Sequence, residues 1–194
     1  MDQLVVELAS LFTLPLERFE HMVIIIAIGM GLAWGSGINL YATLVAVGLM
    51  ALFGHAELPN GLELLENHIL IAVAGVMYIT EFFVSRTVKD DTGWDVVHTF
   101  IYIPAGGMMA AGAVAGSGIV AVVGIGVAGA FLTHLTHNSI LGAKHYLFDR
   151  GEIFSPAASS MVKDIILLAG LWTGFHFPML LITLLIGFII FIYS

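Results

Sequence analysis

Hydrophobic residues form long runs separated by short polar stretches, and this pattern predicts helices that span a membrane. The stretch Gly116-Ser117-Gly118 and the proline at 178 predict two tight turns between such runs. Upstream, the apolar spacing over residues 3–14 predicts a short interfacial helix that ends at Pro15. The pattern predicts about six spans, over residues 22–53, 68–84, 96–115, 119–143, 160–175 and 178–193.

The first run is too long for one plain span. A straight helix over residues 22–53 would be ~48 Å long, whereas the hydrocarbon core of a bilayer is ~30 Å thick. Gly35, Ser36 and Gly37 lie near its middle, where they would allow the helix to break.

The two halves of the chain resemble one another. Residues 22–82 align without a gap with residues 117–177 at twelve identical positions, and a polar stretch interrupts the apolar run in both. We therefore expect an inverted repeat of three plus three helices, with the first and fourth helices broken. Paired broken helices of this kind mark the binding site in many transporters. The alternative is that two membrane segments rich in Gly and Ala share residues by composition. The expected parts of this single membrane domain are an N-terminal interfacial segment (1–20), a first repeat (21–116) and a second repeat (117–194).

Composition excludes an ordinary soluble domain. The chain is 59% hydrophobic and 10% charged, with a mean hydropathy of +1.02, so we expect an all-α membrane protein. The net charge is −8 and no basic cluster is present, which argues against nucleic acid as a partner. The absence of cysteine excludes disulfides and thiolate chemistry.

The basic residues predict an orientation. In a six-span arrangement all of them fall on one side, which the positive-inside rule makes cytoplasmic, together with both termini. These residues are Arg18, Arg86, Lys89, Lys144, Arg150 and Lys163.

Polar residues within the apolar runs are the candidate site, because polar groups in hydrocarbon are costly. A half-helix starting at the first break would present N–H groups to an anion, and the two histidines of the second stretch share a helix face. The alternative is that these side chains bond their own helix or join helices. The candidates are Ser36, Asn39, Tyr41 and Thr43 in the first stretch, and His134, Thr136, His137 and Asn138 in the second.

Three further residues are candidates for proton coupling, namely Glu81, Asp95 and His98. Glu81 can instead pair with Arg86 or Lys89. Asp95 can orient His98 three residues later, or cap the helix that begins there.

Several of these motifs resemble an uncharacterised family of small bacterial inner-membrane proteins, classed as a domain of unknown function. The likeness covers roughly residues 30–170, and Ile140 and Lys163 depart from its pattern. It implies an inner-membrane location but no known activity. The motifs are residues 36–43, 81–82, 94–100 and 104–106, and more loosely 136–137, 154–155 and Asp164.

Three functions fit these features. The first is a small transporter or channel for a polar or anionic solute or a lipid headgroup, with the site at the midplane and a homodimer as a possible assembly. The second is a metal- or haem-binding redox protein that uses His98 and His137. The third is a scaffold whose helices pack through small residues. No nucleophile–base pattern indicates an enzyme, and no cofactor is expected. The small residues that suit close helix packing in a scaffold are Gly106, Gly107, Gly112, Gly116, Gly124 and Gly126.

Overall fold

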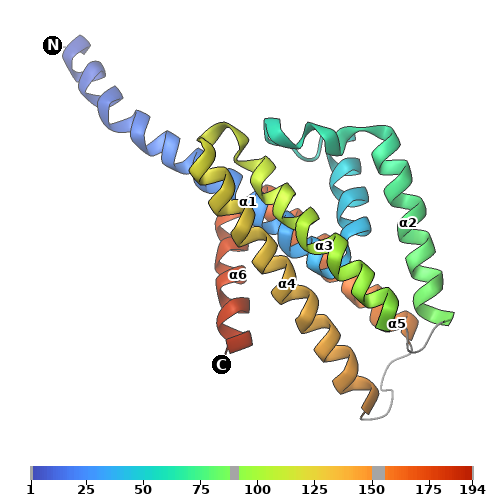
Figure 1. Ribbon diagram of the computed structural model, residues 1–194. Coiled ribbons are helices and arrows are strands. Elements are labelled where there is room, and N and C mark those ends of the chain that lie inside the picture. Colours follow the sequence, from blue (N-terminus) through green and yellow to red (C-terminus); the bar gives the residue numbers. More distant parts are fainter. Residues whose placement is uncertain (1, 88–91, 150–155, 194) are drawn as a thin grey trace.

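The chain is all-helical in the computed structural model, which describes residues 2–87, 92–149 and 156–193. Within these ranges, the side chains of residues 2–16, 84–98, 144–149 and 156–159 are not described. No strand occurs in these ranges, as the sequence predicted. Two short 3-10 helices, η1 (Asn60–Glu66) and η2 (Ala115–Ser117), join longer helices (Figure 1). The long helices are α1 (Asp2–Leu52), α2 (His68–Thr87), α3 (Thr92–Ala113), α4 (Ile119–Asp149), α5 (Pro156–His176) and α6 (Pro178–Tyr193).

Helices α2 to α6 begin at or just before the residues expected from the sequence. Gly118 has a φ of 90°, which suits glycine, and forms the tight turn between α3 and α4. Pro178 starts α6 directly after α5 has ended at His176. The expected end at Pro15 is not observed, because α1 continues through it. A proline removes one backbone hydrogen bond and need not stop a helix.

Two helical stretches of the described chain are long and apolar enough to cross a membrane, Glu17–Leu52 and Ile119–Ala143. A third is added if η1 and His68–Phe83, which meet at 63°, count as one bent span. These lengths are compatible with an integral membrane protein.

Helix α1 is broken at Asn39, where φ is −159° and ψ is 108°. The side-chain Oδ1 of Asn39 accepts a hydrogen bond of 2.9 Å from the N–H of Ala42, so it caps a new helix that starts at Leu40. The expected break is therefore confirmed, but it lies after Gly35 and Gly37. An asparagine can satisfy the N–H groups that a break exposes, which a glycine cannot.

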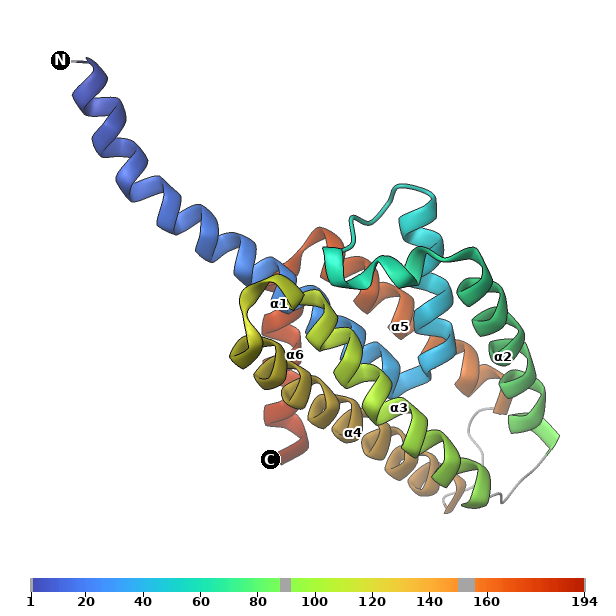
Figure 2. The same cartoon turned by 45° about the horizontal axis from the view of Figure 1, so that its top comes forward.

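Helix α1 returns to the end of the bundle at which it starts. Where α1 enters the bundle, after the exposed residues 17–21, Met22 Sδ accepts a hydrogen bond of 3.3 Å from the hydroxyl of Ser117, in the α3–α4 turn. After α1 has ended, Gly61 in η1 packs against the backbone of Gly112, close to the same turn. The half after Asn39 accordingly runs back at a steep angle to the half before it (Figure 2).

The expected inverted repeat is wrong for these helices. The contacts between Met22 and Ser117 and between Ala33 and Thr133 make the first half of α1 parallel to α4. Inverted repeats would place these two helices antiparallel.

The expected six crossings, with both termini on one side, are also inconsistent with the path of α1. Helix α5 runs opposite to the first half of α1, since Gly170 lies by Trp34, whereas Gly174 and Gly31 both lie by Leu181. Helix α6 turns back on α5 at Pro178 and therefore runs in the same direction as the first half of α1. The end of α6 therefore lies away from the start of α1. Hydropathy alone cannot distinguish a segment that crosses from one that turns back.

The expected break in the fourth helix is also absent, because α4 is helical from Ile119 to Asp149. Its hydroxyl side chains donate to the carbonyl oxygens four residues earlier: Thr133 to Gly129, Thr136 to Leu132 and Ser139 to Leu135, at 2.8–2.9 Å. Such bonds satisfy polar side chains without opening the helix.

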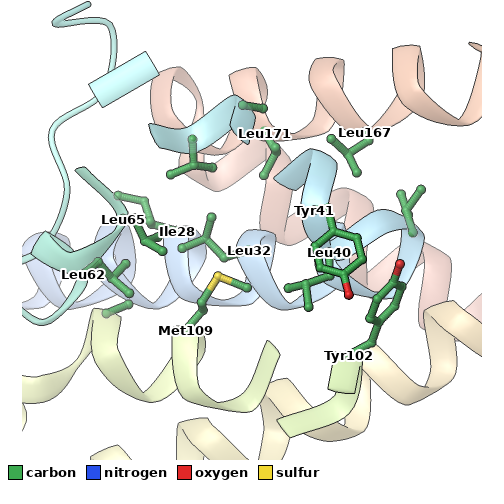
Figure 3. Packing of buried hydrophobic residues seen from close by; sticks show 14 residues of the cluster. Ile28, Leu32, Leu40, Tyr41, Leu62, Leu65, Tyr102, Met109, Leu167 and Leu171 are labelled. Atoms are coloured by element: carbon green, nitrogen blue, oxygen red, sulfur yellow. The ribbon is translucent and has the colours of Figure 1, made fainter. Parts of the chain in front are cut away.

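The core surrounds α1, which packs against all five other long helices. Its largest apolar cluster includes Leu32, Leu40, Tyr102 and Leu171, from α1, α3 and α5 (Figure 3). Small residues allow close packing, as expected: a Cβ atom on Gly107 would lie 3.0 Å from a backbone oxygen of α4. Gly106, Gly112 and Gly126 are similarly close to neighbours, whereas Gly116 and Gly124 have nothing described within 4 Å.

Candidate functional site

The break in α1 lies inside the bundle, against α3 and α4. A Cβ atom on Gly37 would lie 2.6 Å from both the carbonyl oxygen of Thr133 and Cβ of Thr136, so α1 approaches α4 at backbone distance. The hydroxyl of Thr133 also lies 2.8 Å from the carbonyl oxygen of Ala33. The two polar stretches that the sequence singled out therefore meet, although only one of them is broken.

Three of the predicted residues in α1 are buried around the break. Ser36 and Thr43 are fully buried, and their hydroxyls donate to the backbone oxygens of Leu32 and Asn39 at 2.7 and 2.8 Å. Tyr41, also buried, contributes its ring to the cluster described below. The two hydroxyls stabilise the ends of the helices at the break.

The predicted residues in α4 separate into two groups. Thr136 and His137 are buried: Thr136 lies against Gly37 of α1, and His137 packs against Tyr102 of α3. His134 and Asn138 instead lie on another side of α4, where Asn138 is exposed and its Nδ2 lies 3.0 Å from His134 Nε2. The Nδ1 atom of His134 is buried, with no hydrogen-bond partner among the described residues. The structure therefore brings Thr136 and His137 to the break, but not His134 or Asn138.

An aromatic row connects α1, α3 and α4. The ring of Tyr102, which is 1% exposed, packs edge-on against Tyr41 at 6.0 Å and against His137 at 5.5 Å between centroids. Figure 3 shows Tyr41 and Tyr102 side by side next to Leu40, where α1 resumes.

Tyr102 also joins this row to an acidic residue of α2. Its hydroxyl donates a hydrogen bond of 3.0 Å to Glu81 Oε2. A second phenol–carboxylate pair lies nearby, in which Tyr78 donates to Asp164 Oδ2 of α5 at 2.6 Å. Hydrogen bonds to an ionised acceptor are about twice as strong as neutral ones, so both carboxylates are well held.

Sequence reasoning missed Tyr78 and Tyr102, and noted Asp164 only as part of the family resemblance. One signal was available, since Tyr78 and Glu81 are three residues apart and share a face of α2. The pairing of these groups across α2, α3 and α5 depends on tertiary packing and has no sequence signature.

Asp95 and His98 belong to α3, but their side chains lie outside the described part of the structure. The same holds for the side chains of Arg86 and Lys89, which the sequence offered as partners of Glu81. No group of three His, Cys, Asp or Glu side chains that could hold a metal ion occurs among the residues whose side chains are described. The described part of the site therefore offers hydrogen-bonding groups and carboxylates, which suit a small polar solute or a proton.

Comparison with curated proteins gives no match, and neither does comparison with solved structures. One family model matches residues 26–194, which include all the helices around the break. It is described as a domain of unknown function, DUF4126. The chain thus belongs to the DUF4126 family, in agreement with the resemblance noted from its motifs.

Proposed function

We propose that the protein is a small membrane transporter or channel, and that a polar solute binds at the break in α1. The observation that carries the proposal is the non-helical backbone at Asn39, inside a bundle of apolar helices. Irregular backbone at membrane depth is tolerated where it is buried in protein or lines a water-filled cavity. In secondary transporters such breaks hold the substrate or the coupling ion.

The polar groups around the break support a site for a solute. Gly37, two residues before Asn39, packs against Thr136 of α4, and Tyr102 of α3 packs against His137 of α4 and donates a hydrogen bond to Glu81 of α2. An amide, a hydroxyl and an imidazole can each donate and accept hydrogen bonds. Such a set suits a solute that carries both donors and acceptors.

The charge at the break narrows the class of solute. The new helix that starts at Leu40 has a positive dipole end, which favours an anion. The carboxylate of Glu81 accepts a hydrogen bond from Tyr102, whose ring packs against Tyr41 just after the break, and this negative group opposes an anion. A neutral or cationic polar solute therefore fits better than the free anion or the lipid headgroup that the sequence also allowed.

We further propose that α2 to α6 cross a bacterial inner membrane, whereas α1 enters it and turns back. Five of the six basic residues lie at or near the links from α2 to α3 and from α4 to α5, which the positive-inside rule makes cytoplasmic. Arg18, near the start of α1, would then lie on the other side. This orientation replaces the one with both termini in the cytoplasm.

Cysteine accessibility tests the proposal, and the cysteine-free chain provides its own blank. Single cysteines at Asn39 and His137 would be treated with a small, charged, membrane-impermeant thiol reagent in sealed vesicles. A cysteine at Thr183, exposed on α6 with its hydroxyl bonded to its own helix, is the matched control on the outer surface. We expect Asn39→Cys and His137→Cys to react and Thr183→Cys to remain unlabelled in the bilayer.

A lack of labelling at the two site cysteines would contradict the proposal. If both site cysteines stay unlabelled in folded protein, yet react once the protein is denatured, the break is dry helix packing. The scaffold function would then be favoured over transport.

A further inference from the structure

The outward side of α4 carries an amide at membrane depth. Asn138 is exposed and belongs to the helical stretch Ile119–Ala143, which is long and apolar enough to cross a membrane. The middle of this stretch is Phe131, and Asn138 follows it by about 10 Å along the helix axis. The hydrocarbon core of a bilayer extends ~15 Å to either side of its centre. In a helix that crosses the membrane, an outward amide at this depth meets lipid tails unless another protein covers it.

Most of the hydrogen-bonding capacity of Asn138 is unused. Its Nδ2 lies 3.0 Å from His134 Nε2. Since an amide nitrogen can only donate, this contact uses one N–H of Asn138, and the imidazole nitrogen accepts. The second N–H and the lone pairs of Oδ1 have no partner among the residues whose side chains are described. Polar groups without a partner are unfavourable in hydrocarbon, so Asn138 favours a neighbour that can bond it.

Two other exposed polar side chains on apolar helices do not need such a neighbour. The hydroxyls of Thr80 in α2 and Thr183 in α6 donate to carbonyl oxygens of their own helices, four residues earlier, at 2.8 and 2.9 Å. These bonds satisfy a hydroxyl without help from outside the helix. Asn138 differs from both threonines, because its hydrogen bond goes to a side chain and leaves the amide oxygen open.

The surface around Asn138 suits the packing of another helix. Val127 and Phe131 lie four residues apart and are exposed, at 65% and 54%. His134 and Asn138 continue this row at spacings of three and four residues. Such alternation is the seam pattern of two helices that pack side by side. Gly142, one turn after Asn138, is exposed and has nothing described within 4 Å of an added Cβ, so a second backbone can approach closely there.

A second copy of the chain fits this face better than an unrelated helix. Copies of one membrane protein insert with the same orientation, so their α4 helices run parallel. In a pair with two-fold symmetry, each residue on the seam then faces its own equivalent at the same depth. Asn138 would meet the partner's Asn138, and the two amides are complementary, since the N–H of each can donate to Oδ1 of the other. An unrelated helix would need a matching polar group at this depth.

We propose that the protein forms a parallel homodimer through the outward face of α4, with the Asn138 amides of the two copies hydrogen-bonded to each other. The sequence left a homodimer open but did not indicate its surface. Thr133 and Thr136 contact α1 from the other side of α4, so this face is separate from the break. The dimer therefore requires α4 to cross the membrane, but it does not depend on a solute at the break.

Disulfide formation between single cysteines tests the surface. Full-length Phe131→Cys, in the otherwise cysteine-free chain, would be reconstituted at low density in lipid vesicles and oxidised with copper phenanthroline. Two cysteines can join only where their Cα atoms approach to about 4.4–6.8 Å. Leu184→Cys is the matched control, because Leu184 has an exposed fraction of 55% and lies near the middle of α6. We expect disulfide-linked dimers from Phe131→Cys, and only the yield of random collisions from Leu184→Cys.

The role of the amide is tested by the strength of the dimer. Energy transfer between copies labelled at the N-terminus, measured as the protein is diluted with lipid, gives the dissociation constant. Asn138→Leu keeps a side chain of similar size but removes its hydrogen bonds, and we expect the dissociation constant to rise about tenfold, the scale of one hydrogen bond between helices in a membrane. Asn138→Gln retains an amide and should remain close to the wild type.

Two results would overturn the proposal. Equal disulfide yields from Phe131→Cys and Leu184→Cys, in protein shown to be folded by circular dichroism, would mean that lipid or another protein covers this face of α4. An unchanged dissociation constant in Asn138→Leu would mean that the amide lies outside the interface. Neither result bears on the solute site, which is tested by the labelling of Asn39→Cys and His137→Cys.

Discussion

Substituting Gly37 by alanine should destabilise the protein through one defined collision. The added Cβ would lie 2.6 Å from the Thr133 carbonyl oxygen and 2.6 Å from Cβ of Thr136, and 3.0 Å is a separation below which such contacts are essentially never seen. Since one of these atoms is backbone, α1 or α4 must shift. Overpacking of this kind typically costs about 1–3 kcal/mol.

Alanine also has a higher helix propensity than glycine, by about 1 kcal/mol, which would mask part of this cost. Gly124→Ala is the control, because Gly124 lies within α4 and has nothing described within 4 Å of an added Cβ. The difference between the two variants isolates the collision. At about 2–4 °C per kcal/mol for a chain of this size, Gly37→Ala should unfold roughly 2–12 °C below Gly124→Ala.

Thermal unfolding of the detergent-purified protein, followed by circular dichroism at one scan rate, measures this difference. If the two variants unfold at the same temperature, α1 does not approach α4 at Gly37, and the geometry of the break is wrong.

Three further predictions follow from individual hydrogen bonds. Asn39→Ala removes the cap at the break and should lower the free energy of unfolding by about 1 kcal/mol, whereas Asn39→Asp should retain most of it; equal losses would exclude the cap. In a double-mutant cycle on the free energy of unfolding, Tyr78→Phe and Asp164→Asn should show a coupling energy of about 0.5–3 kcal/mol. Strictly additive effects would mean that the Tyr78–Asp164 hydrogen bond is not formed. Thr133→Val should lower the free energy of unfolding by about 0.6–1.7 kcal/mol. The loss should exceed that of Thr183→Val on the exposed face of α6, because of these two hydroxyls only that of Thr133 also bonds another helix. Equal losses in the two variants would contradict that contact.

Helix positions could be predicted from the sequence because long apolar runs are separated by clear breaks. Gly118 and Pro178 mark turns through their backbone preferences, and both turns are observed. The interruption of the first run was predicted from its length and from the glycines near its middle. Its location at Asn39 was not, because glycine permits both a break and close packing, and in α1 Gly35 and Gly37 serve the packing.

The direction of α1 after the break could not be predicted from hydropathy, which is the same for a segment that crosses and one that returns. The aligned halves suggested inverted repeats, yet Met22 and Ser117 occupy equivalent positions in that alignment and lie side by side, Met22 in α1 and Ser117 in the turn before the parallel helix α4. Similar composition in two helices of one bundle explains the identities without symmetry.

The candidate site was predicted in part. Asn39, Thr136 and His137 were singled out because polar residues in apolar runs are rare, and they lie around the break. His134 and Asn138 drew attention for the same reason, but a helix surface distributes neighbouring polar residues over different faces. Tyr102 was missed because aromatic residues are common in membrane helices, and its role depends on a hydrogen bond to Glu81, 21 residues away in the chain.

The return of α1 to its own end of the bundle is tested most directly by the sidedness of three single cysteines. Glu20, His55 and Gly116 are exposed, and they lie before the helical hairpin, after it and in the α3–α4 turn. Each variant, in sealed vesicles of known orientation, would be treated with an impermeant thiol reagent added from one side. We expect all three cysteines to be labelled from the same side of the membrane. Labelling of Glu20→Cys and His55→Cys from opposite sides would show that α1 crosses the bilayer, and would contradict the return of the chain at Asn39.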